Sequence, residues 1–216
     1  MSAQAETRTG QAERQWWLRL FRVLTAPSSV FVWLRDDSAE AANARQEPIT
    51  AVVFLAGVSI FLSTRTAGRL FDDIEFDWLL VVVEAVVAGL LVAVQNFWIL
   101  GGAVYLGGRA ADSAASYRQG RHVTGLATIP WVLALVFVWP VRLAMFGADA
   151  FRSGGSDHGP VEAVFRTIDI GLLVWSAVLV YLGVRALNGW SWARSLAGCA
   201  VAAVVFALIV LLFVAV

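Results

Sequence analysis

Four polar or small residues lie along one face of the longest apolar segment of this chain. They are Asp77, Glu84, Gln95 and Gly102, with Asn96 beside them, and the four are 7, 11 and 7 residues apart. These steps keep them within about 20° of one line on a helix of 3.6 residues per turn. A carboxylate at the centre of a bilayer costs about 2.5–3.5 kcal/mol on insertion scales, so it faces the protein interior or water. The line therefore predicts an ion- or proton-sensitive site within a helical bundle.

Charged residues of two other apolar segments could complete or neutralise this site. Arg142 lies near the end of the third segment, and Asp169 enters the fourth, three residues after Arg166. If Arg142 pairs with Glu84, or if Glu84 reaches the outer surface, the carboxylate has a structural role. Both interpretations stay open. The candidate intramembrane polar site contains Glu84, Gln95, Asn96, Arg142 and Asp169.

The residues that catalysis and metal binding require do not cluster in the sequence. Cys199 is the only cysteine, and His122 and His158 each stand alone, so we expect both histidines to be solvated loop residues. A nucleophile with a base, a metal triad or a Walker-type loop would be needed for chemistry, and none is visible. We expect no enzymatic activity, no cofactor and no metal. The acidic segment Asp72–Asp77 could bind a divalent cation, but a solvated negative rim is the better explanation.

Five apolar segments separated by short arginine-bearing loops must position these residues. They are Ile49–Thr64, Trp78–Leu106, Leu126–Gly147, Ile168–Leu187 and Ala193–Val216. A helix needs about 20 mostly apolar residues to cross a bilayer, a length that the last four reach and the first nearly reaches. The chain has 216 residues, of which 59% are hydrophobic. The sequence predicts an all-α, polytopic transmembrane bundle of five spans.

Two sequence patterns predict how these spans are shaped and packed. Pro130 and Pro140 lie inside the third segment, where proline removes a backbone donor and favours a kink. The fifth segment has a small residue at every fourth position from Ser191 to Ala207. Such a stripe permits close approach by another helix of the same molecule or of a second copy.

The residues before the first span predict an interfacial amphipathic helix. One face carries Trp16, Trp17, Leu20, Phe21 and Leu24, and the other carries Gln15, Arg19 and Arg22. Tryptophans favour headgroup depth and arginines favour anionic lipid, so the membrane-interface residues are Trp16, Trp17, Arg19 and Arg22. A helix packed beneath the bundle is the alternative, and both arrangements can hold together. We expect Pro27 to end this helix and Asp36–Pro48 to form a polar linker, with a helix around Ala41 and Ala42 as the alternative.

The distribution of arginines predicts the orientation in the membrane. With the N-terminus inside, eleven arginines fall on the inner side and five on the outer side, the five being Arg65, Arg69, Arg142, Arg152 and Arg166. The positive-inside rule then favours a cytoplasmic N-terminus and an outside C-terminus in the cell membrane. Residues 1–47 are predicted to form a cytoplasmic N-terminal segment, and residues 48–216 the five-span bundle.

Several of these features, in this order, resemble the Yip-domain family of five-span membrane proteins. The first are Thr25-Ala26-Pro27 with Phe31 downstream, then the glycine-rich stretch Gly101–Gly108. Ser116-Tyr117-Arg118-Gln119 and Pro130 follow. The last are the stretch from Trp175 through Tyr181-Leu182-Gly183-Val184-Arg185 and the turn Asn188-Gly189-Trp190-Ser191. The resemblance covers most of Gln11–Ala203, and prokaryotic-type members are the most similar.

The resemblance implies a topology rather than a defined activity. Eukaryotic members are linked to Rab-type small GTPases, vesicle budding and membrane shaping, largely through their cytoplasmic N-terminal regions. The N-terminal region here is short and carries no recognisable aromatic-glycine-proline motif. We expect a non-enzymatic membrane-organising or partner- or lipid-binding protein. Its partners would be the lipid bilayer, a lipid ligand, a membrane protein or a second copy, with no nucleic acid. The alternative is a small transporter, channel or lipid-translocating protein that uses the polar line of the second span.

Overall fold

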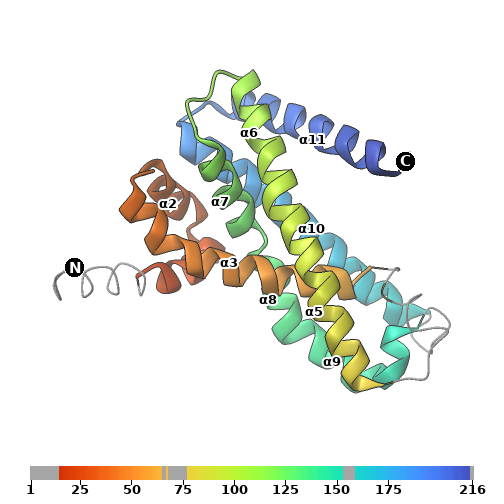
Figure 1. The fold of residues 1–216 in the computed structure, drawn as a ribbon. Helices are drawn as coiled ribbons and strands as arrows, with labels where there is room; N and C mark the ends of the chain where they lie inside the picture. Colours follow the sequence, from red (N-terminus) through yellow and green to blue (C-terminus); the bar gives the residue numbers. More distant parts are fainter. Residues whose placement is uncertain (1–14, 65–66, 68–76, 153–158, 215–216) are drawn as a thin grey trace, which may run out of the picture.

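The computed structural model describes residues 15–64, 67, 77–152 and 159–214, and the elements within them are helical with no strand. The first helix, residues 15–25, is followed by α2 (Pro27–Val32), η1 (Trp33–Arg35), α3 (Ala39–Leu62), α5 (Trp78–Val94), η2 (Gln95–Leu100) and α6 (Gly101–Ala110). The rest are α7 (Tyr117–Ala127), α8 (Ile129–Leu133), η3 (Ala134–Val138), α9 (Trp139–Phe146), η4 (Gly147–Phe151), α10 (Pro160–Asn188) and α11 (Trp192–Val214). Figure 1 shows their arrangement.

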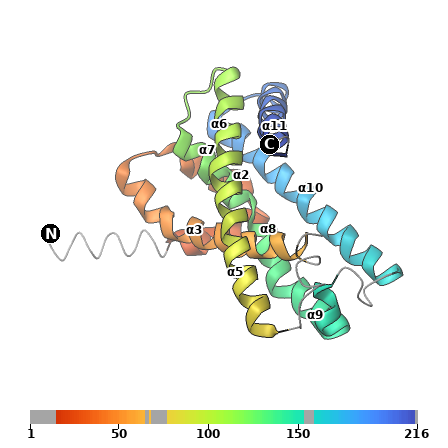
Figure 2. The ribbon, with the colours of Figure 1, turned by 45° about the vertical axis from the view of Figure 1, so that its right-hand side comes forward.

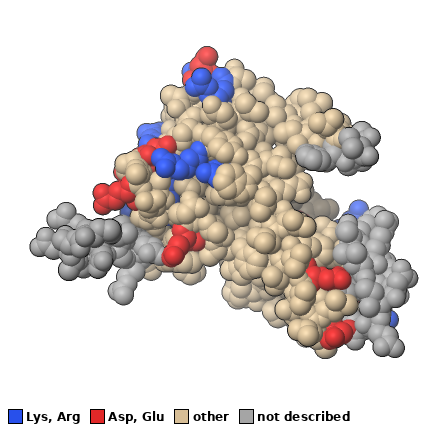
Figure 3. Space-filling view, in the orientation of Figure 1, with Lys and Arg blue, Asp and Glu red and all other residues tan. Residues whose placement is uncertain are grey.

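Five helical stretches are long and apolar enough to cross a membrane. They are Ala39–Leu62, Trp78–Ala110, Tyr117–Phe151, Pro160–Asn188 and Trp192–Leu212. Their surfaces carry many exposed leucines and valines, as expected of helices that face lipid. On the face drawn in Figure 3, most charged side chains gather toward the end that holds α2 and the α6–α7 connection. The predicted all-α, five-span bundle is confirmed.

The first spanning helix begins earlier than predicted. Ser38 accepts a hydrogen bond from the Ala41 amide and caps α3, which continues through Pro48 to Leu62. The polar linker predicted over Asp36–Pro48 is therefore wrong from Ala39 onward, whereas the helical alternative around Ala41 and Ala42 agrees with α3. This stretch is polar in sequence because one side of the first turns of α3 is exposed, while the other side is buried against protein segments. Helix α3 also crosses the predicted boundary at residues 47 and 48, and that division into two parts stays a prediction.

Close approach of α3 and α5 depends on a glycine in each helix. A Cβ at Gly57 would lie 2.8 Å from the Ala93 Cβ, and a Cβ at Gly89 would lie 2.7 Å from the Val58 Cα. Both distances are too short for a side chain, so the two backbones are in direct contact. Small residues at such crossings allow membrane helices to gain dispersion energy where the hydrophobic effect is weak. Figures 1 and 2 show α3 crossing α5 in both views.

Helix α6 meets α11 through a second pair of small-residue surfaces. A Cβ at Gly107 would lie 2.7 Å from the Ala202 backbone nitrogen and would collide with the Gly198 carbonyl oxygen. Ser195 is fully buried on the same face of α11. Small residues of the fifth span therefore pack against α6 of the same molecule. The contact stripe runs through Ser195, Gly198 and Ala202 rather than at every fourth residue.

The third span is interrupted at two places, which confirms the predicted kink. Helix α7 ends before Thr128, and Pro130 lies in the first turn of α8, where its missing amide proton costs no helical hydrogen bond. The π-helical segment η3 then precedes Trp139 and Pro140. A π-helical turn is a common way of accommodating a local disruption of the hydrogen-bond ladder.

We predict that Gly57→Ala lowers the thermal stability of the purified protein in detergent. The added methyl group must push α3 away from α5, and overpacking of this kind costs about 1–3 kcal/mol. Gly171→Ala in α10 is the matched control, because nothing lies within 4 Å of its added Cβ. Thermal unfolding followed by circular dichroism checks this. Equal melting temperatures for the two variants would contradict the contact.

Candidate functional site

A buried polar cluster joins the N-terminal segment to the third span. It consists of Asp37, Arg45, Ser116, Arg118 and His122, and we call it the Asp37 cluster. Asp37 follows η1, Arg45 lies in the second turn of α3, and the other three come from the start of α7. Segments about 80 residues apart in sequence are thus held together by charged groups.

Arg45 is the centre of the Asp37 cluster and has 0% exposure. Its Nε donates to His122 Nδ1 over 2.9 Å, Nη1 donates to the Asp36 carbonyl oxygen over 2.6 Å, and Nη2 donates to Asp37 Oδ1 over 3.0 Å. A buried guanidinium is tolerated only when it is paired and hydrogen-bonded. Each of its three nitrogens has an acceptor, so the charge is stable where it is.

The Asp37 carboxylate accepts hydrogen bonds from three side chains, those of Arg45, Arg118 and Ser116. Arg118 Nε donates to Oδ1 over 2.8 Å, and Ser116 Oγ donates to Oδ2 over 2.7 Å. Burial raises the pKa of the Asp37 carboxyl, but the hydrogen bonds from Arg118 and Ser116 and the charges of Arg118 and Arg45 outweigh it. The pKa of Asp37 is therefore below its usual value, and the carboxylate is ionised at neutral pH.

His122 is fully buried, so its predicted place in a solvated loop is wrong. It lies in α7 and stacks on the Phe97 ring with 6.2 Å between centroids. Because Nδ1 accepts a hydrogen bond from Arg45, the imidazole is neutral in this arrangement and its proton is on Nε2. Enclosed in this way, His122 supports packing rather than proton exchange with water. His158 lies outside the described residues.

Further hydrogen bonds tie the helix ends together near the Asp37 cluster. Arg35 donates to the carbonyl oxygens of Ala186 and Leu187, near the C-terminus of α10. Arg194 does the same for Ala111, just after α6. A cation at a helix C-terminus satisfies free carbonyl groups and complements the helix dipole. These bonds and the Asp37 cluster place α2, the α6–α7 connection and the α10–α11 turn at one end of the bundle.

The structure separates the predicted polar residues of the second span. Glu84 is half-buried, and its Oε2 has no hydrogen-bond partner among the described residues. Gln95 is exposed, whereas the Asn96 amide donates to the Val92 carbonyl oxygen of its own helix. The buried stripe of α5 advances four residues at a time from Val81 to Ala93. This stripe drifts around the helix, so the predicted straight line does not remain on one buried face.

Arg142 and Asp169 are brought within range of electrostatic attraction. Arg142 lies in α9 and Asp169 in α10, and the positive charge of Arg142 acts on the Asp169 carboxyl. The Arg142 guanidinium also lies 5.1 Å from the Trp139 ring centroid and 5.7 Å from the Phe165 ring centroid. A cation over an aromatic face is attracted to its quadrupole. The contact with Phe165 joins the third and fourth spans. The role of the five predicted polar residues stays a prediction.

The helix over residues 15–25 has two apolar faces instead of one. Trp16 and Val23 are buried in the main core, with 4% and 0% exposure. Trp17, Leu18 and Phe21 have 42%, 69% and 73% exposure. The indole of Trp16 thus packs against the protein, which agrees with the alternative of a helix packed beneath the bundle, and the membrane-interface role of these residues stays a prediction. Arg19 and Arg22 remain accessible beside the exposed face.

One sequence pattern, a helix capping box, indicates where the α7 part of the Asp37 cluster begins. Ser116 and Gln119 form a capping box, in which Ser116 Oγ accepts from the Gln119 amide and the Gln119 side chain accepts from the Ser116 amide. That pattern starts a helix at Tyr117 and puts Gln119, His122 and Leu126 on one face.

Among the described residues no group of three metal-binding side chains occurs. The acidic residues 72–76 lie outside them.

We predict that Arg45→Gln strongly destabilises the protein. The change leaves Asp37 and His122 without their shared donor, and breaking a buried ion pair typically costs about 3–5 kcal/mol. Arg185→Gln is the control, because it removes the same charge from an exposed position of α10. Thermal unfolding in detergent compares the two. A melting temperature of Arg45→Gln equal to that of the control would show that the Asp37 cluster contributes nothing.

Low pH should lower the stability of the folded protein, because it protonates Asp37. Because the folded pKa lies below the unfolded value of about 3.9, this stabilisation is complete above that value and is lost as the pH falls through the folded pKa. The nearby Asp36 has a lowered pKa through its hydrogen bonds with Ser38 and loses stabilisation in the same range. Asp37→Asn should flatten the acid dependence of the melting temperature. An unchanged slope in that variant would refute the assignment.

Comparison with known families agrees with this architecture. The family model described as the Yip1 domain matches residues 21–215, which is nearly the whole chain. The match begins within the N-terminal helix and includes the Asp37 cluster and the five spanning stretches. No curated protein and no solved structure matches the chain. The chain is a multi-pass membrane protein, and it belongs to the Yip1-domain family.

Proposed function

We propose that this protein is a non-enzymatic membrane organiser that inserts its N-terminal helix, residues 15–25, into one leaflet of the bilayer. The observation that carries the proposal is the pair of apolar faces on this helix. Trp16 and Val23 fix one face to the protein core, while Trp17, Leu18 and Phe21 leave the other exposed. Exposed aromatic and leucine side chains beside arginines are typical of a helix at the membrane interface.

The rigid attachment of this helix gives it a means of acting on the membrane. It packs against the same core as α2, α3 and α7, and the Asp37 cluster holds those segments together. A helix inserted into one leaflet adds area to that leaflet alone. Because it cannot leave the bundle, every copy of the protein would place this extra area at a fixed position beside its spans.

We also propose the cell membrane as the location, with the N-terminus in the cytoplasm. Eleven of the sixteen arginines then lie on the inner side, in accord with the positive-inside rule. The end of the bundle that holds the Asp37 cluster would be cytoplasmic. Arg19 and Arg22 would then face the anionic lipid of the inner leaflet. A lipid, a membrane protein or a second copy of this protein would bind at this cytoplasmic end or against the membrane-spanning helices.

One observation supports the alternative of a small transporter or channel. Glu84 places a carboxyl oxygen in a buried position with no hydrogen-bond partner among the described residues. An intramembrane carboxyl group is a candidate for proton or ion binding. Arg142 and Asp169, the other charged residues of the predicted polar site, lie on the third and fourth spans. Gln95 is exposed, so it adds nothing to a site at Glu84, and the membrane-organising function is the better supported.

Liposomes containing the full-length protein test the proposed function. We expect wild-type protein to reduce the vesicle radius measured by electron cryomicroscopy at increasing protein content. Trp17→Ala/Phe21→Ala should return the radius to that of protein-free liposomes, because the inserted apolar surface is lost while the buried face is untouched.

Leu208→Ala/Leu211→Ala is the control for this experiment. These side chains are also largely exposed, but they lie on α11, within a predicted span. The control should reduce the radius as the wild type does. If the Trp17/Phe21 variant shapes vesicles as well as the wild type, or if the wild type leaves the radius unchanged, the proposed function is wrong.

A further inference from the structure

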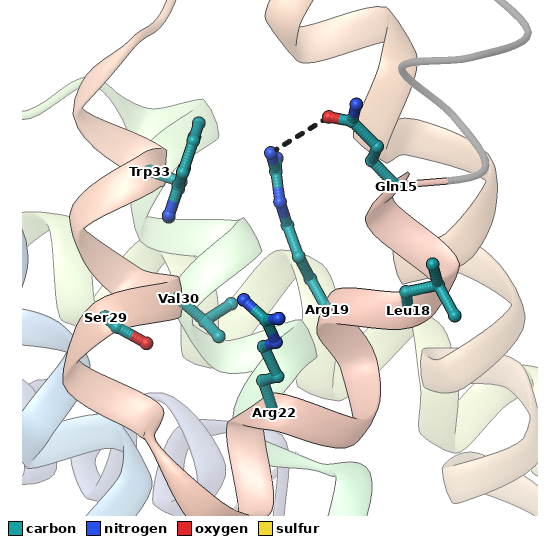
Figure 4. A pocket seen from close by; sticks show the side chains of 7 residues that line it. All are labelled: Gln15, Leu18, Arg19, Arg22, Ser29, Val30 and Trp33. Carbon is teal, nitrogen blue, oxygen red and sulfur yellow. Dashed lines mark hydrogen bonds between the residues drawn. The ribbon is translucent and has the colours of Figure 1, made fainter.

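A cavity of about 250 Å³ lies between the N-terminal helix and α2–η1. Its walls are Gln15, Leu18, Arg19, Arg22, Ser29, Val30 and Trp33. Figure 4 shows the side chains of Arg19 and Arg22 rising from one helix into the space that Trp33 and Val30 border on the other side. The cavity is therefore walled by two short helices that the core holds together.

The described walls of this cavity carry a positive charge. Two guanidinium groups line it, and no carboxylate does among the residues that the structure describes. Arg22 lowers the pKa of Arg19, although burial lowers it more. The two cations thus lie close enough to repel each other. Within the described residues, Arg19 donates to the neutral Gln15 amide oxygen over 3.3 Å, and no ion pair is formed by either arginine. An anion between them would remove this repulsion.

Aromatic stacking holds Arg19 in position. Its guanidinium carbon lies 3.8 Å from the Trp33 ring centroid and 5.0 Å from the Trp16 ring centroid. Stacking uses the flat face of a guanidinium and leaves its N–H groups free at the edge. Of the two rings, Trp16 is buried in the core and anchors one side of this arrangement, while Trp33 is largely exposed. A preorganised arginine loses less side-chain entropy on binding.

We propose that this cavity binds the phosphate group of an anionic phospholipid. Arg19 and Arg22 would donate charge-assisted hydrogen bonds to the phosphate oxygens, the contact in which arginine is strongest. Leu18 and Trp33, both largely exposed, would contact the glycerol and the upper acyl chain. This assignment rests on the proposed function for the depth of residues 15–25 in the membrane, and it identifies the lipid class that the helix recognises.

A lipid fits this cavity better than a soluble phosphate for two reasons. The wall is half apolar, since Leu18, Val30 and Trp33 lie beside the arginines. The exposed face of the same helix, with Trp17 and Phe21, offers a surface for the chains of that lipid. Ser29 donates its hydroxyl proton to the Ala26 carbonyl oxygen, so the two arginines supply the binding hydrogens.

Native mass spectrometry of the full-length protein with added lipid tests this assignment. The probes are phosphatidylglycerol and phosphatidylcholine with identical acyl chains, with inorganic phosphate as the soluble competitor. We expect the wild type to bind phosphatidylglycerol about tenfold more tightly than phosphatidylcholine, because the choline cation of phosphatidylcholine neutralises its phosphate and repels the two arginines. Arg19→Gln/Arg22→Gln should bring the two lipids to equal affinity.

Two further variants keep the experiment decisive. Arg22→Gln changes an exposed side chain and spares the Arg19 stack, so it should lose part of the preference without harm to the fold. Arg185→Gln removes one positive charge elsewhere and should keep the full preference.

Equal phosphatidylglycerol affinity in the double variant and the wild type would overturn the site. Displacement of phosphatidylglycerol by inorganic phosphate would overturn the lipid as its ligand. Neither result depends on vesicle radius, so the site can fail while the proposed function stands. An unchanged vesicle radius with the wild type, or full vesicle shaping by the Trp17/Phe21 variant, with headgroup preference retained, would give the reverse outcome.

Discussion

A positive charge without access to water is the constraint on which the described structure depends. Arg45 has 0% exposure, and desolvation of a guanidinium is so costly that its three acceptors must stay in place together. Those acceptors come from the residues after η1 and from α7. Holding them fixes where α3 begins, where the N-terminal helices lie and how the third span enters the bundle. The apolar contacts of the spans then pack around that arrangement.

Hydropathy was sufficient to predict the number, order and helical nature of the spans, because the bilayer sets the length of an apolar segment. Side-chain partners could not be predicted in the same way. Arg45 lies in a polar stretch whose burial depends on residues about 80 positions away, and Trp16 shares its helix with Trp17 but faces the core. The buried stripe of α5 drifts away from Gln95 according to which helices pack against α5, and the sequence of α5 alone does not encode its neighbours.

The N-terminal helix combines two roles that sequence patterns treat as alternatives. A single apolar face predicts either packing on a protein or lying on a membrane. Residues 15–25 turn Val23 to the core and Phe21 outward, and between these faces the arginines border a cavity. The same short helix can therefore be rigidly held and still contact lipid. Because Trp16 and Val23 pack in the same core as α2, α3 and α7, the position of this helix depends on the packing of the bundle.

Because of the π-helical segment η2, the number of residues in the second span determines which neighbouring helix each half of the span faces. Gly89 faces α3 and Gly107 faces α11, yet 18 residues make five full turns and would put both on one side of a straight α-helix. A π-helical turn accommodates one extra residue, which rotates the following half by about 100°. The two halves of one continuous rod can thus contact different neighbours. Loss or gain of one residue near Phe97 would misdirect α6 while leaving hydropathy unchanged, so natural length variation should be confined to the loops.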